Sequence, residues 1–209
     1  SQYVAFLNKL SYKQQVTRTA VAPSSAAGTA TMTTGTLYRN GIVIMTPGIP
    51  STTSAVYACN LDNDANYDEV NDGQSIACNW LSWADVAAYL DWAALRPMTE
   101  LEYEKAGRGN QDPVANEYAW GNTTINCATS IINPGANNEI AQAGANCVCD
   151  NASGVQGPMR VGNFAQASTT RSSAGASYYG IMELCGNLNE RPVTVGNPDG
   201  RAFTGLRGN

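Results

Sequence analysis

The sequence predicts an α+β domain with two or three short helices, few short strands and long ordered loops. Three observations support this class. Helix start signals occur in the first half of the chain, where a capping residue precedes an apolar stripe at helical spacing. A β-branched run near residue 42 predicts a strand. From residue 110 onward, Gly, Asn and Pro recur every few residues, which indicates short strands or tight loops and no further long helix.

The first ten residues predict a short amphipathic helix that Ser1 can cap. One face of this helix carries the apolar side chains Tyr3, Val4, Phe6, Leu7 and Leu10. Residues 11–36 are rich in Ser, Thr and Ala with little periodicity, so we expect a long surface excursion there. Residues 39–47 predict a strand, because they hold a β-branched run. Residues 58–78 predict a loop dense in Asp and Asn.

Two further helices have strong start signals. Ser82 stands three residues before Asp85, and Thr99 stands three residues before Glu102, which is the spacing of a capping box. Carboxylates at a helix start favour the helix dipole, so we interpret Glu100, Glu102 and Glu104 as helix residues and not as glycosidase acids. Inward packing is expected for Leu101, Tyr103 and Ala106.

Composition excludes several classes of function. The chain has 209 residues, 43% hydrophobic and 14% charged, which is enough apolar material for one folded domain. No run approaches the roughly 20 apolar residues of a membrane-spanning helix, so we expect no membrane insertion. The net charge is −5, and no basic cluster is present, so we expect no nucleic acid partner. The absence of histidine excludes a Ser-His-Asp triad, a histidine zinc site and a histidine general base.

The chain has six cysteines, at positions 59, 78, 127, 147, 149 and 185. An even number favours a disulfide framework, although six cysteines permit many connectivities. Free buried thiols and a metal site are the alternatives, but no C-x-x-C pair or histidine supports a metal. Cys147 and Cys149 are too close in sequence to bridge each other easily. Disulfides and a surface rich in Asn, Thr, Ser and Gly are typical of secreted or cell-surface modules.

The loop after the predicted strand carries a D-x-D-x-N-x-D pattern. Its oxygen ligands stand at alternate positions, as in calcium loops: Asp62, Asp64, Asn66 and Asp68. The EF-hand pattern is incomplete, since Tyr67 and Gly73 occupy the positions of its Gly and its bidentate Glu. The alternatives are a calcium site and a solvated acidic turn. A Cys59–Cys78 disulfide would close this loop and stabilise it by roughly 3 kcal/mol.

Asn122 and Asn151 begin N-x-[ST] glycosylation sequons, which also arise by chance in a chain rich in Asn and Thr.

Six ordered motifs resemble the formylglycine-generating enzyme (sulfatase-modifying factor) family. Residues 79–92 resemble its V-S-W-x-D-A-x-A-Y helix, and residues 95–109 its R-L-P-T-E-x-E-W-E-Y-A-x-R-G-G helix. Matches to Y-P-W-G-N, V-G-x-F, G-L-x-D-M-x-G-N-V-W-E and L-R-G-G-S-W follow at residues 118–122, 161–164, 179–190 and 206–209. Residues 2–10 resemble the first helix of the family. The resemblance implies a C-type-lectin-like fold for a single domain over residues 1–209, with an unmapped insertion at about 11–78.

The departures from the family bear on function. The resemblance implies that the two catalytic cysteines, which hold copper and activate oxygen, lie beyond the L-R-G-G-S-W segment. None of the six cysteines occupies those positions, and without histidine the iron branch of the family is excluded, so we expect neither a copper nor an iron site. Asn189 replaces the usual Trp of the G-N-x-W-E motif.

The resemblance also implies roles for single residues. Asn187 and Glu190 lie in the G-N-x-x-E loop that contributes calcium ligands in the family; alternatively, this loop is a structural turn in which Glu190 pairs with Arg191 or Arg207. Three of the four tryptophans, Trp80, Trp83, Trp92 and Trp120, fall on motif positions. We therefore expect tryptophans in the core and not a sugar-stacking platform.

Two functions remain. The first is a non-catalytic extracellular or cell-surface module that binds other copies of itself and assembles into a polymer by strand addition. Glycans or surface proteins are its other candidate partners. The second is a formylglycine-generating oxidase acting on a sulfatase cysteine. The sequence favours the first.

Overall fold

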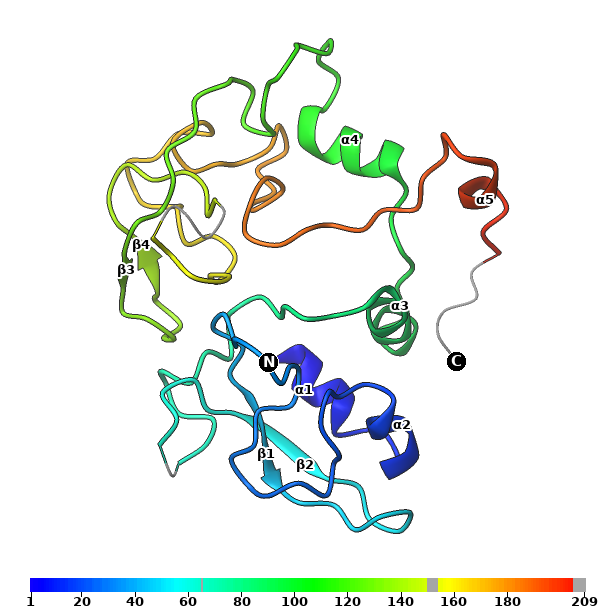
Figure 1. The fold of residues 1–209 in the computed structure, drawn as a ribbon. Coiled ribbons are helices and arrows are strands. Elements are labelled where there is room, and N and C mark those ends of the chain that lie inside the picture. Colours follow the sequence, from blue (N-terminus) through cyan, green and yellow to red (C-terminus); the bar gives the residue numbers. More distant parts are fainter. Residues whose placement is uncertain (65, 150–153, 205–209) are drawn as a thin grey trace.

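The computed structural model describes residues 1–64, 66–149 and 154–204 (Figure 1). It is a mixed α+β structure of short elements joined by long loops, which confirms the predicted class. The helices are α1 Gln2–Leu7, α2 Tyr12–Val16, α3 Trp83–Trp92, α4 Glu100–Arg108 and α5 Pro198–Arg201. The strands are β1 Ile42–Thr46, β2 Val56–Cys59, β3 Ile131–Ile132 and β4 Ile140–Ala141. Among the described residues, no helix combines the length and the apolar character needed to cross a bilayer.

The strands form two antiparallel pairs. In the first pair Ile42 lies opposite Cys59 and Ile44 opposite Tyr57. In the second, β3 and β4 are only two residues long. The first pair lies with α1 and α2 in the lower half of Figure 1, and the second lies above it among the loops of residues 120–165.

Both edges of the β1–β2 sheet are occupied. Residues 28–31 cover β1, where the Gly28 amide donates to the Ile44 carbonyl at 2.7 Å. Side chains cover β2: Asn8 accepts from the Tyr57 amide at 2.8 Å and donates to the Tyr57 carbonyl at 3.0 Å. Asp68 Oδ1 accepts from the Cys59 amide at 2.9 Å. The backbone groups that an added strand would need are therefore already bonded.

Buried apolar side chains of the described residues form two clusters. The first joins α1 to the β1–β2 sheet, as Tyr3, Val4, Phe6, Leu7, Met32, Ile42, Ile44, Ala55, Tyr57 and Cys59. The second lies around β4 and the loops after it, as Ala128, Ala141, Ala145, Val148, Val155, Met159 and Phe164. The apolar face predicted for the first helix is thus confirmed, since its side chains enter the first cluster.

Residues 1–16 contain one helix that sequence reasoning missed. α1 ends at Leu7, and Ser1 makes no side-chain capping bond. α2 begins at a capping box in which Ser11 and Gln14 bond each other's backbone. The S-x-x-Q spacing was a readable signal for it. The strand β2 was also missed, because its residues stand beside the Asp-rich loop.

The caps of α3 and α4 are confirmed, at Ser82 with Asp85 and at Thr99 with Glu102. The inward packing predicted for Leu101 is wrong, because Leu101 is 64% exposed, whereas Tyr103 and Ala106 are half-buried and the Tyr103 hydroxyl donates to the Leu184 carbonyl. Most tryptophans also lie outside the core. Trp120 is buried, whereas Trp80 and Trp92 are each 45% exposed.

Candidate functional site

The loop after β2 brings three carboxylates together. Oxygens of Asp62, Asp64 and Glu69 all lie within 4.8 Å of one another, and the three residues are exposed. Amide donors hold two of them in place. The Asn66 amide N–H donates to Asp64 Oδ1 at 2.6 Å, and Asn71 Nδ2 donates to Asp62 Oδ2 at 2.6 Å. We call Asp62, Asp64 and Glu69 the acidic cluster.

The predicted ligand set is only partly brought together. Asp62 and Asp64 belong to the acidic cluster, but Asp68 turns to the strand and accepts from the Cys59 amide at 2.9 Å. The side chain of Asn66 donates through Nδ2 to Asp64 Oδ2 at 3.3 Å. Glu69 takes the third place, although sequence reasoning did not single it out. Its signal was the continuation of the acidic run beyond Asp68.

A fourth carboxylate, Asp72, lies buried beside the acidic cluster. Asp72 is 0% exposed. Its Oδ2 accepts from the Glu69 amide at 2.7 Å, and its Oδ1 has no hydrogen-bond partner. Burial raises the pKa of Asp72, and the nearby carboxylates of Asp62 and Asp64 raise it further, whereas the Glu69 hydrogen bond lowers it.

The residues that follow the acidic cluster dock onto the second half of the chain. The Gly73 amide donates to the Gly135 carbonyl at 3.0 Å, and Ser75 Oγ donates to Asn137 Oδ1 at 2.7 Å. Gly135 has φ +81°, and a Cβ there would lie 2.1 Å from the Asn71 carbonyl oxygen. The loop is therefore packed against residues 135–137 at close range.

The Cys59–Cys78 disulfide expected from the sequence is wrong in this structure. Both residues are free thiols. Cys59 belongs to the first apolar cluster, while the Cys78 thiol is directed to the Asn79 carbonyl at 3.6 Å and accepts from Asn40 Nδ2 at 3.9 Å. Burial raises the pKa of Cys59, and it raises that of Cys78 to about 12.

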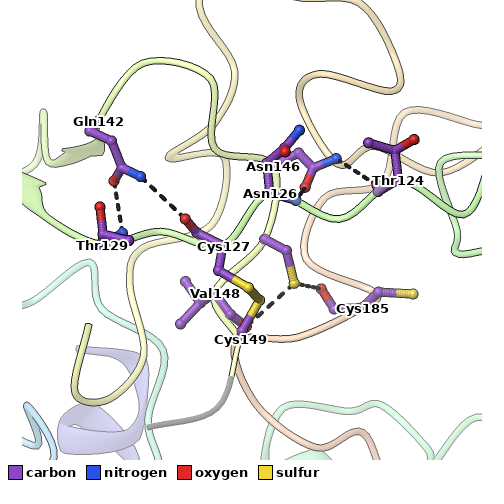
Figure 2. Close-up of a disulfide and its surroundings, with 10 residues drawn as sticks. Thr124, Asn126, Cys127, Thr129, Gln142, Asn146, Val148, Cys149 and Cys185 are labelled. Carbon is purple, nitrogen blue, oxygen red and sulfur yellow. Dashed lines mark hydrogen bonds between the residues drawn. A yellow bond between two sulfur atoms is a disulfide. The ribbon is translucent and has the colours of Figure 1, made fainter. Parts of the chain in front are cut away.

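The disulfide of the described residues joins Cys127 and Cys149 (Figure 2). Gln142 bonds the backbone next to the disulfide. Its side chain accepts from the Thr129 amide at 3.0 Å and donates to the Cys127 carbonyl at 3.2 Å. Beside the disulfide, Asn146 Oδ1 accepts from the Asn126 amide at 2.9 Å and so joins the two segments that carry Cys127 and Cys149.

The other two cysteines, Cys147 and Cys185, are free and adjacent. The Cys147 thiol donates to the Cys185 carbonyl at 3.3 Å. Cys185 Sγ accepts from the Ala119 amide at 3.3 Å. Burial, followed by the neighbouring Cys185, raises the pKa of Cys147 to about 11, and burial also raises the pKa of Cys185.

The G-N-x-x-E loop uses its asparagine for structure. Asn187 Oδ1 accepts from the Met159 amide at 2.8 Å, and its Nδ2 donates to the Met159 carbonyl at 3.2 Å. Glu190 contacts the Tyr103 hydroxyl, and burial raises the pKa of Glu190. The geometry of Asn187 matches the structural turn, and calcium binding at Asn187 and Glu190 stays a prediction. Arg207, one of the two residues expected to pair with Glu190 in that turn, lies outside the described residues.

A buried acid that sequence reasoning missed lies nearby. Glu183 is 8% exposed and accepts from Asn163 Nδ2 at 3.0 Å. Burial raises the pKa of Glu183 to about 7. Asn163 Oδ1 is also buried, without a partner. An acidic residue inside the apolar run of residues 181–184 was the signal.

One glycosylation sequon can be placed. Asn122 is half-buried, and its Nδ2, the atom that would carry a glycan, donates to Ser172 Oγ at 2.7 Å. Asn151 lies outside the described residues. Glycosylation at both positions stays a prediction.

Comparison with known proteins gives one family. The family model of the sulfatase-modifying factor enzyme 1-like domain matches residues 1–194. The matched range includes residues 11–78. No curated protein and no solved structure matches the chain.

Proposed function

The chain belongs to the sulfatase-modifying factor enzyme 1-like family, whose domain is C-type-lectin-like, and we propose that within this family it is a non-catalytic extracellular or cell-surface module. The main support for this proposal is that the free cysteines are protonated. Copper ligation and nucleophilic catalysis both use the thiolate form of cysteine.

All four free cysteines of the described residues are held as thiols, because burial raises the pKa of each: Cys59, Cys78, Cys147 and Cys185. Such thiols are poor nucleophiles near neutral pH. Cys59 and Cys147 are buried and behave as small apolar residues of the core, while Cys78 and Cys185 are half-buried. The Cys127–Cys149 disulfide supports the location, since disulfides persist in oxidising compartments.

Incubation of the purified chain with copper, oxygen and a cysteine-containing sulfatase peptide tests the proposal. We expect mass spectrometry to find the peptide thiol unchanged. Formation of the aldehyde at that cysteine would overturn the proposal and establish the enzyme.

An exposed apolar row supports binding of a partner. We use this name for four exposed apolar side chains that follow one another in the sequence between the end of α3 and the start of α4, Trp92, Leu95, Met98 and Leu101, each between 42% and 64% exposed. Apolar side chains that adjoin one another on a protein surface are typical of interaction sites. Strand addition at β1–β2 is disfavoured, because both edges are occupied. We therefore propose that copies of the chain associate through the apolar row.

Sedimentation at rising protein concentration tests this association. We expect oligomers of the wild-type chain that the Leu101→Glu variant dissociates. The matched control is Val114→Glu, at a residue 59% exposed outside the row, which should leave the oligomers intact. A wild-type chain that stays monomeric at high concentration contradicts self-association.

The second candidate is a formylglycine-generating oxidase acting on a sulfatase cysteine. The family match favours it, because the matched domain is described as enzyme-like. The peptide assay above decides between the two functions.

A further inference from the structure

We propose that the acidic cluster of Asp62, Asp64 and Glu69, with the buried carboxylate of Asp72 behind it, binds one calcium ion that fastens this loop to residues 135–137. The proposal is independent of the non-catalytic function, since a catalytic or a structural domain could use such an ion equally. Exposed acidic residues alone would be insufficient evidence for a calcium site, because such clusters are common on protein surfaces without an ion.

Asp72 supplies the second observation. A buried polar atom normally has a hydrogen-bond partner, and an unpaired buried carboxylate oxygen is costly. Asp72 Oδ1 has none, although the residue is completely buried. The Glu69 amide donates to Oδ2 of this carboxylate, and the side chain of Asp62 lies within hydrogen-bonding reach of Asp72. A cation between Asp72 and the acidic cluster would give Oδ1 its missing partner.

The charges around the acidic cluster also favour a bound cation. The ion pairs found among the described residues involve five other carboxylates: Asp85, Glu102, Glu104, Glu117 and Glu139. None of them uses Asp62, Asp64, Glu69 or Asp72. The three carboxylates of the acidic cluster, and Asp72 beside Asp62 and Asp64, thus take no part in these ion pairs with arginine, and like charges at close range repel one another. Bound calcium would turn that repulsion into attraction.

The donor chemistry favours calcium over other ions. The acidic cluster and Asp72 offer only carboxylates, which are hard oxygen ligands, and among the described residues no thiol or imidazole belongs to the group of Asp62, Asp64 and Glu69. Calcium accepts six to eight oxygens in irregular geometry, so four carboxylates and water on the exposed side suit it. Asn71 and the Asn66 amide already orient Asp62 and Asp64. Magnesium requires near-octahedral ligands and is expected to bind more weakly.

The location of the site gives the ion a structural role. Asp72 is followed directly by Gly73, whose amide bonds the Gly135 carbonyl at 3.0 Å, and Ser75 bonds Asn137. Ordering of the Asp62–Asp72 loop therefore also orders its contact with the second half of the chain. We expect calcium to protect both segments from hydrogen exchange, residues 60–76 and residues 133–139 together.

The test uses the full chain and the metal alone. We expect millimolar calcium to raise the melting temperature, as it does for extracellular calcium sites, and chelator to reverse the change. Asp72→Asn keeps the size of the side chain and is expected to weaken calcium binding roughly tenfold or more. Without calcium this variant should melt at the same temperature as wild type or higher, because one repelling charge is gone. A merely structural role of Asp72 would instead lower the melting temperature in both conditions.

Two controls locate the ion. Asp112→Asn removes an exposed carboxylate outside the loop and should leave the calcium response unchanged. Glu190→Gln should also leave it unchanged, and loss of the response in that variant would move the site to the G-N-x-x-E loop and overturn the proposal. No response of the wild-type chain to calcium would overturn it as well. Protection confined to residues 60–76 would overturn the fastening to residues 135–137.

Discussion

Arg39 and Glu139 form an ion pair across one hundred residues of sequence, and the Glu139 side chain in it is completely buried. Arg39 Nη1 lies 3.2 Å from Glu139 Oε1 and also donates to the Pro158 carbonyl at 2.7 Å. Glu139 Oε2 accepts from the Gly135 amide at 2.7 Å. The pair thus joins the segment before β1 to the loops around β4, close to the place where the acidic loop docks.

The Glu139→Gln variant should unfold more easily. Loss of one partner from a buried ion pair leaves the other charge uncompensated, so we expect a loss of about 3 kcal/mol in the free energy of unfolding. Urea denaturation measures it. The control is Glu104→Gln, which breaks an i,i+4 pair whose carboxylate is 56% exposed and should cost about 0.4 kcal/mol. Equal losses in the two variants would show that Glu139 contributes no more than a surface charge.

The Gly135→Ala variant tests the close approach of the acidic loop. An alanine would have to adopt φ +81°, and its Cβ would lie 2.1 Å from the Asn71 carbonyl oxygen. Left-handed strain costs about 1 to 2 kcal/mol, and displacement of Asn71 adds to it. Gly144→Ala separates the two effects, because Gly144 has φ +86° and nothing within 4 Å. Thermal melting should therefore show a larger loss at Gly135, and similar losses would argue against tight docking.

Signals that are local in the sequence predicted where α3 and α4 begin, because a capping box involves two residues that are three apart. Ser82 with Asp85 and Thr99 with Glu102 began helices as expected. Ser11 with Gln14 carried the same signal inside a stretch that we interpreted as a surface excursion. The inward packing of Leu101 failed because helical periodicity shows which side chains share a face and not whether another element covers that face.

The candidate site was predictable only in part for the same reason. The D-x-D-x-N spacing placed Asp62 and Asp64 together, because neighbours two apart in a tight loop stay close. The residues directly after Asp72 contact a segment about sixty residues later, where Gly73 bonds Gly135 and Ser75 bonds Asn137, and local spacing does not show such contacts. Cysteine pairing likewise depends on distant contacts, and spacing alone could not distinguish Cys127–Cys149 from the alternatives.

Loss of the Cys127–Cys149 disulfide should destabilise the second half of the chain. The two residues are 22 apart in sequence, and for such a loop the constraint on the unfolded chain contributes about 3 kcal/mol. We expect Cys127→Ser to lower the denaturation midpoint by a corresponding amount, and reductant to have no further effect on that variant. A non-reducing peptide map should link Cys127 to Cys149, and a link from Cys127 to any other cysteine contradicts the structure.

The stability of the chain should depend on the protonation of Glu183. Burial raises the pKa of Glu183 from 4.5 to about 7, with a further rise from the charge of Glu190 and an opposing effect of Arg160. The folded chain therefore keeps a proton that the unfolded chain loses above pH 4.5. By linkage, stability falls as the pH rises from about 4.5 to 7, by up to about 3 kcal/mol, and below this window Glu183 contributes no penalty.

The Glu183→Gln variant should remove this dependence. A glutamine can keep the bond from Asn163 Nδ2 and adds a donor beside Asn163 Oδ1, which is buried without a partner. We expect the variant to exceed wild type in free energy of unfolding at pH 8 and to match it at pH 4, as measured by urea denaturation across that range. Asp112→Asn, at an exposed carboxylate, should keep the wild-type slope. A Glu183→Gln variant that is less stable than wild type at pH 8 would mean that the folded chain favours the charged form of Glu183.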